Sequence, residues 1–70
     1  MSLATEIKTT SIGQRIRHYL LLRDMSILEL SDKFGITRQG MGYKLENDAF
    51  DIPDIKKVAE ILKINIADLI

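Results

Sequence analysis

The sequence of 70 residues contains no cysteine, a single proline and no long hydrophobic run. Without cysteine it can form neither a disulfide nor a thiolate metal site, which fits a reducing compartment. The longest uninterrupted apolar run is residues 19–22, far short of the roughly 20 residues that cross a bilayer. The first ten residues also lack the apolar segment of a signal peptide. These absences lead us to expect a cytoplasmic protein. We also expect a single domain, because a chain this short can bury only one core.

The sequence also lacks net charge, since it has ten basic and ten acidic residues. The two signs are nevertheless separated along the chain. Residues 8–44 contain seven basic and three acidic residues, whereas residues 45–70 contain three basic and six acidic ones. Such a distribution can give a neutral protein one basic face, which is what phosphate binding requires. The alternative is a scatter of solubilising charge without functional meaning.

Two serines in the first half of the sequence mark helix starts. Each is followed three residues later by Gln or Glu, the spacing of a capping box, in which each side chain satisfies a backbone N–H of the other residue. The two pairs are Ser11 with Gln14 and Ser26 with Glu29. Apolar residues at helical spacing follow both pairs and predict helices over about 11–23 and 26–34. Gly35 comes directly after the second, where a helix end favours positive φ.

A third helix is predicted after a short turn. Thr37 is a good N-cap residue, and Ile36 and Met41 have the spacing of a hydrophobic staple. Leu45 lies one turn further along and continues the inward face. We therefore expect a helix over about 37–46, joined to the preceding helix by about three residues.

The rest of the chain predicts one longer helix and a short last turn. Pro53 suits a first helical turn, where its missing N–H costs nothing, and an apolar stripe from Ile55 to Leu62 follows it. Asn65 and Asp68 have the spacing to cap a final turn.

The expected fold class is therefore all-α, a compact domain of four to five helices over residues 11–70, preceded by a flexible tail over residues 1–10. No strand-like alternation is present. The predicted core consists of Ile12, Ile16, Leu30, Phe34, Ile36, Met41, Leu45, Val58 and Leu62.

Two short helices joined by a glycine-containing turn have the organisation of a helix-turn-helix unit. Such a short connection makes the second helix cross the first steeply, so that one of its faces can enter a DNA major groove. With Met41 and Leu45 inward, the outward residues are Arg38, Gln39, Gly42, Tyr43 and Glu46. Arginine suits guanine O6 and N7, and glutamine suits adenine N6 and N7. Glycine within a helix costs up to about 1 kcal/mol relative to alanine. Close approach of the helix backbone to another surface would explain why Gly42 stands at this position.

Several landmarks with a characteristic joint spacing extend over residues 12–70. They are Ile12-Gly13-x-x-Ile16-Arg17, Ser26-x-x-x-Leu30-Ser31, Gly35-Ile36-Thr37-Arg38, the stretch from Ile55 to Leu62, and Ile66-Ala67-Asp68-Leu69. On these landmarks the chain resembles the λ repressor/Cro-type family of prokaryotic and phage regulators. The resemblance implies a fold of five helices, of which the third enters the major groove, and a dimer on two-fold-symmetric operators.

Three positions depart from that family's pattern. Ile27 stands where a glutamine often contacts a phosphate, and Ser31 replaces the usual alanine. Asn47-Asp48 stands where Asn-Gly is common, so that Glu46 and Asp48 bring two acidic groups near the expected DNA side.

Together these features predict sequence-specific binding of double-stranded DNA by a transcriptional regulator that acts as a repressor. The expected base contacts are Arg38, Gln39, Gly42, Tyr43 and Glu46, the last able to accept from cytosine N4 or to repel phosphate. The expected phosphate contacts are Arg17, Ser26, Thr37 and Lys44.

Some of these assignments have alternatives. Arg15 and Arg23 are the alternatives to Arg17, and Lys44 has equal claim to be a plain surface lysine. A weak homodimer is expected, and its interface is formed by one of two apolar groups. They are Ile66, Leu69 and Ile70, or Leu21 and Leu22.

The rival hypothesis is a helical protein–protein interaction module of the same fold that does not bind DNA. Zero net charge, Ile27 and the acidic residues after Leu45 favour it. We expect no enzyme, because the sequence has no Gly-rich phosphate loop, metal-ligand spacing or nucleophile with a base. Asp51 and Asp54 fall at a helix start, where the helix dipole favours acidic residues. We likewise expect no cofactor, metal, membrane association or small-molecule ligand.

Overall fold

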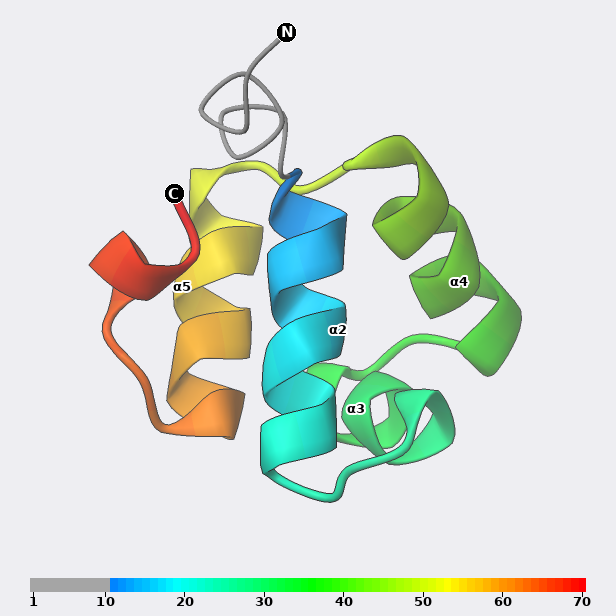
Figure 1. The fold of residues 1–70 in the computed structure, drawn as a ribbon. Coiled ribbons are helices and arrows are strands. Elements are labelled where there is room, and N and C mark those ends of the chain that lie inside the picture. Colours follow the sequence, from blue (N-terminus) through cyan, green and yellow to red (C-terminus); the bar gives the residue numbers. More distant parts are fainter. Residues whose placement is uncertain (1–10) are drawn as a thin grey trace, which may run out of the picture.

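The computed structural model describes residues 11–70, so the tail predicted over residues 1–10 lies outside the described residues. The described chain forms four α-helices and one 3₁₀ turn, with no strand (Figure 1). The elements are α2 (Ile12–Leu22), α3 (Ile27–Phe34), α4 (Arg38–Asn47), α5 (Ile52–Leu62) and η1 (Ile66–Asp68). The all-α class is confirmed. Among residues 11–70, no helix is long and apolar enough to cross a membrane.

The caps of α2 and α3 form largely as the serine spacing predicts. At the start of α2, Ser11 and Gln14 satisfy each other's backbone N–H, so this capping box is confirmed. At the start of α3, the Oγ of Ser26 accepts a hydrogen bond from the N–H of Glu29. The Glu29 side chain makes no return bond within the described chain, so the prediction of a complete box was wrong there. Glu29 is exposed, and hydration competes with a single surface hydrogen bond.

The helix α5 begins before its proline rather than at it. Asp51 is the N-cap, and its side chain accepts from the N–H of Asp54 at 2.9 Å. The Asp54 carboxylate accepts in return from the N–H of Asp51 at 3.3 Å. Pro53 lies in the first turn, where no intrahelical hydrogen bond needs its N–H. The two aspartates are therefore helix caps.

Left-handed backbone ends three of the helices. Gly35 follows α3 with φ 98°, as predicted for a helix end. α4 ends at Asp48 with φ 51°, and α5 ends at Lys63 with φ 58°. Aspartate adopts this region at modest cost, but no glycine marks either end in the sequence.

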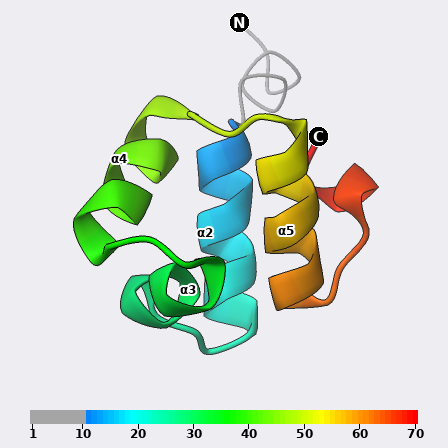
Figure 2. The same cartoon turned by 180° about the vertical axis from the view of Figure 1, so that it is seen from behind.

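The helices are arranged around α2. In both Figure 1 and Figure 2, α2 lies between α4 and α5, and α3 crosses near the carboxyl end of α2. α3 packs against both α4 and α5, and η1 packs against α5. One hydrophobic core fills the space between the elements, and it consists of Ile16, Leu20, Leu30, Phe34, Met41, Leu45, Ile55, Val58, Ala59, Leu62 and Leu69. The arrangement leaves α4 at one side of the molecule.

The predicted core is correct except at its edges. Ile12 and Ile36 are only half-buried and pack against the cluster from outside. Leu69, which was expected at a dimer interface, is instead fully buried. The 3₁₀ turn η1 folds back on α5 and places Leu69 in the core. Leu69 therefore cannot contribute to a dimer interface.

Gly13 allows α2 to pack directly on the end of α4. A Cβ at this position would overlap the carbonyl oxygen of Leu45. The N–H of Gly13 also donates to Oδ1 of Asp48 at 2.8 Å. The absence of a side chain at Gly13 thus sets how closely α4 approaches the centre of the domain.

Two arginines of the α2 region hold the carboxyl-terminal part of the chain. Nη1 of Arg15 donates to the carbonyl oxygen of Ile70 at 2.8 Å. Nε of Arg23 donates to the carbonyl oxygen of Leu62 at 2.8 Å, at the end of α5. A cation at a helix carboxyl end also interacts favourably with the helix dipole. Arg15 and Arg23, the alternatives to Arg17 as phosphate contacts, therefore anchor the fold.

Candidate nucleic-acid interface

The turn between α3 and α4 consists of three residues, Gly35 to Thr37. Gly35 reverses the chain in left-handed backbone, and Thr37 starts the next helix in extended backbone. Both Figure 1 and Figure 2 look nearly along the axis of α3, whereas α4 runs across the view. The two helices therefore cross steeply, as so short a connection requires.

The helix α4 has one buried face and one polar face. Met41 and Leu45 are in the core, at 0% and 3% exposed. The expected base-contact residues Arg38, Gln39 and Glu46 are exposed. Tyr43 is exposed by 65% although it is aromatic. The predicted orientation of α4 is thus the one observed.

Gly42 lies on the outer side of α4 and is not explained by packing. A Cβ there would meet nothing within 4 Å, in contrast to Gly40, where it would lie 3.2 Å from the hydroxyl of Thr37. Glycine in a helix interior costs about 0.5–1 kcal/mol relative to alanine. Within the described chain, nothing offsets this cost at Gly42.

Two hydroxyl groups lie at the helix starts of this unit. Oγ of Ser26 accepts from the N–H of Glu29 at 3.0 Å, and Oγ1 of Thr37 accepts from the N–H of Gly40 at 3.0 Å. Both residues are exposed. These bonds use acceptor positions, so each O–H remains a donor that can reach an anion at the helix start.

An ion pair joins α2 to the end of α4. Nη2 of Arg17 lies 3.2 Å from Oε2 of Glu46. Arg17 was expected to bind a phosphate and Glu46 to contact a base. In this structure the two side chains bind each other.

Lys44, expected to be either a phosphate contact or a plain surface lysine, is bonded within the domain in this structure. Its Nζ donates to Oδ2 of Asp54 at 3.0 Å and to the carbonyl oxygen of Ala49 at 3.1 Å. It also lies 5.9 Å and 5.6 Å from the ring centroids of Phe34 and Phe50. The hydrogen bond from Lys44 holds the pKa of Asp54 below its ordinary value, and the capping contacts with Asp51 act in the same direction. Lys44 therefore ties α4 to the start of α5.

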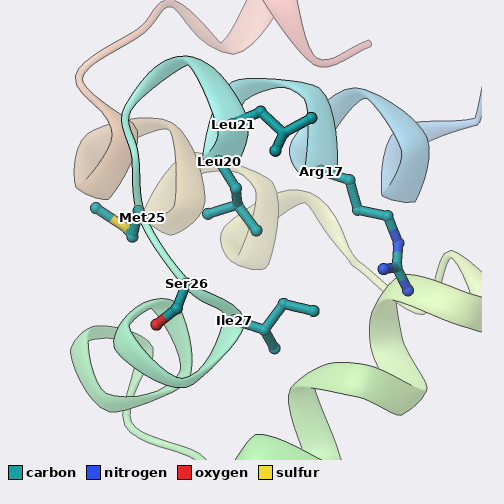
Figure 3. A pocket seen from close by; sticks show the side chains of 6 residues that line it. All are labelled: Arg17, Leu20, Leu21, Met25, Ser26 and Ile27. Atoms are coloured by element: carbon teal, nitrogen blue, oxygen red, sulfur yellow. The ribbon is translucent and has the colours of Figure 1, made fainter.

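Sequence reasoning missed an apolar hollow beside this interface. It has a volume of about 400 Å³ and lies between the carboxyl half of α2 and the start of α3 (Figure 3). Its lining residues are Arg17, Leu20, Leu21, Met25, Ser26 and Ile27. The one signal in the sequence was Ile27, an apolar residue at a helix start where a polar one was expected. No group of three or more metal-ligating side chains occurs in the described part of the chain.

Two steeply crossed helices, a three-residue turn and an outward polar face on the second helix define a helix-turn-helix domain. The family model for the Cro/C1-type HTH DNA-binding domain matches residues 15–70. The chain belongs to this family, which confirms the resemblance found in the sequence. No curated protein and no solved structure matches the chain. The family match supports DNA binding by a regulator.

Proposed function

We propose that this domain binds double-stranded DNA sequence-specifically, with α4 in the major groove, and that it acts as a repressor. The single observation that carries the proposal is the outer face of α4, where exposed polar side chains flank a glycine that packing does not require. A polar helix face directed away from the body is the form in which this fold reads base edges. Repression requires only that the bound domain exclude other proteins from its operator.

Base recognition is assigned to the first two turns of α4. Arg38 and Gln39 provide the donors and acceptors that guanine and adenine present in the major groove. Tyr43 adds a hydroxyl and a ring one turn further along. Gly42, between them, allows the helix backbone to approach the groove more closely than any other residue would.

Phosphate binding is assigned to Arg17, Ser26 and Thr37. The serine and threonine hydroxyls lie at the amino ends of α3 and α4, where the helix dipole favours an anion. Arg17 lines the same hollow as Ser26 (Figure 3). Together these three groups would fix the register of α4 without reading sequence.

Two copies on a two-fold-symmetric operator are part of the proposal, because one small domain makes few base contacts. Half-sites would lie about 34–36 Å apart. Leu21, Leu22 and Ile70 are exposed by 82%, 59% and 60% and are the candidate contacts, together with the half-buried Ile66. Sedimentation showing a single copy on the selected duplex would remove the dimer.

The second candidate function is a protein–protein interaction module. The apolar hollow and the exposure of Leu21 beside it favour this function, since apolar surface on a small domain often marks an interface. Neutral overall charge agrees with it as well.

Selection of bound sequences from a random duplex pool tests the proposed function. Gln39→Ala should change the preferred bases and cost about 1–3 kcal/mol on the selected duplex. Lys56→Ala is the control, because Lys56 is an exposed cation on α5, on the other side of α2 from α4. Failure of the unmodified chain to bind any duplex at low salt would favour the interaction module.

A further inference from the structure

The ion pair between Arg17 and Glu46 connects a proposed phosphate contact to a residue that the sequence pattern predicted as a base contact. Figure 3 shows the Arg17 side chain reaching from α2 toward α4. Its Nη2 donates to Oε2 of Glu46 at 3.2 Å. The side chains are exposed by 42% and 74%, so the pair lies at the surface and can open.

We propose that Glu46 is a positioning residue that acts through Arg17 and weakens phosphate binding. The inference rests on the proposed function and gives Glu46 a role other than reading a base. A guanidinium binds carboxylate and phosphate oxygens with the same donors and in the same geometry. The tethered carboxylate of Glu46 therefore competes with a DNA phosphate for Arg17.

The position of Glu46 supports this role better than a base contact. Glu46 lies in the last turn of α4, whose bounds are Arg38–Asn47, while the residues assigned to base edges occupy the first two turns. Its carboxylate is directed to α2 by the ion pair. Breaking the pair on DNA binding would cost the same amount on every duplex, because Arg17 contacts no base.

The expected size of the effect follows from the exposure of the pair. Exposed ion pairs contribute little, and their measured couplings correspond to about 1.5- to 5-fold in an equilibrium constant. Glu46→Gln keeps the side-chain shape and removes the charge. It should therefore tighten binding to any duplex by about 1.5- to 5-fold. If Arg17 gains a phosphate that it does not reach in the unmodified chain, the salt dependence should also steepen by up to about 0.9.

The test is a double-mutant cycle on the full chain, measured by fluorescence anisotropy with a labelled selected duplex and a scrambled duplex of equal length. The four proteins are the unmodified chain, Glu46→Gln, Arg17→Ala and the double variant. Glu46→Gln should tighten both duplexes by the same factor and leave the preferred bases unchanged. In the Arg17→Ala background the same substitution should change affinity by less than about 1.5-fold. Glu60→Gln on α5 is the matched control and should change nothing, since Glu60 is exposed and its helix lies away from α4.

Three results would overturn the inference. A change in the preferred base would make Glu46 a base contact. A gain that survives in the Arg17→Ala background would mean plain repulsion of phosphate, independent of Arg17. Weaker binding by Glu46→Gln would mean that the carboxylate holds Arg17 in its binding position. If the unmodified chain binds neither duplex, the proposed function itself fails, and that outcome is distinct from all three.

Discussion

Replacing Gly42 by alanine separates the stability of the free protein from its affinity for DNA. A Cβ at this position meets nothing within 4 Å, and the residue lies in the interior of α4. Because alanine is favoured over glycine in a helix interior by about 0.5–1 kcal/mol, the free Gly42→Ala protein should be more stable by that amount. In a domain of this size the melting temperature should rise by about 2–8 °C.

DNA affinity should change in the opposite direction. If the backbone of α4 approaches the groove at Gly42, an added methyl group overpacks that contact. Overpacking of a close interface costs about 1–3 kcal/mol. The Kd for the selected duplex should then rise by about 5- to 150-fold.

The assay compares thermal melts by circular dichroism with anisotropy titrations of the same samples, and two other glycines provide controls. Gly13→Ala should be destabilised, because its Cβ overlaps the carbonyl oxygen of Leu45. Gly40→Ala tests a helical glycine whose Cβ would press on the hydroxyl of Thr37 at 3.2 Å. A lower melting temperature for Gly42→Ala would refute the open position of this residue. A higher melting temperature together with an unchanged Kd for the selected duplex would refute the close approach of α4 to DNA.

Three further outcomes concern stability. Phe34→Ala should remove about 3–5 kcal/mol, comparable to the whole stability of a small domain, so its melt should lose cooperativity; a sharp melt near that of the unmodified chain would contradict the core. Arg23→Met keeps the methylene groups but loses the hydrogen bond to the end of α5, and chemical denaturation should show a loss of about 0.5–1.5 kcal/mol. The lowered pKa of Asp54 adds stability that is fully present above its ordinary value of 3.8 and is lost as pH falls through the lower folded value. The free energy of unfolding of the unmodified chain should therefore exceed that of Asp54→Asn by less in acid than at neutral pH. Lys44→Met removes the main cause of the lowered pKa, so in that background the difference at neutral pH should be smaller. A difference in unfolding free energy that does not depend on pH would refute the contact.

Helix starts could be predicted because they depend on neighbours in the sequence. An N-cap such as Ser11 or Thr37 bonds to a backbone N–H three residues away, so its spacing is visible without a fold. The two faces of α4 could be predicted for the same reason, since helical periodicity alone sets Met41 and Leu45 against the outward residues. The outward polar face of α4 could therefore be predicted from the sequence.

The partners of charged side chains could not be predicted, because they lie on other elements. The role of Lys44 was predicted from its position on α4 alone. Its carboxylate partner, Asp54, was interpreted only as an acidic residue at the start of α5, so the ion pair between them was not predicted. The loop of residues 48–51 brings Lys44 and Asp54 together. Its geometry depends on left-handed backbone at Asp48, and the sequence has no glycine there that would predict this conformation. Leu69 was misassigned for a related reason, since only the return of η1 onto α5 buries it.

The internal use of basic side chains limits how much positive charge this neutral domain can offer to DNA phosphates. Of the six basic residues between positions 11 and 44, four donate to oxygens of the protein itself, and they are Arg15, Arg17, Arg23 and Lys44. The positive balance of this segment is therefore partly consumed by the fold and does not all face a partner. If the domain binds DNA as proposed, phosphate contacts, which bind every sequence alike, would contribute less than the charge count suggests. On the proposed function, base contacts by α4 would then carry a correspondingly larger share of the affinity, and a second copy on a symmetric site would double them without requiring further positive charge.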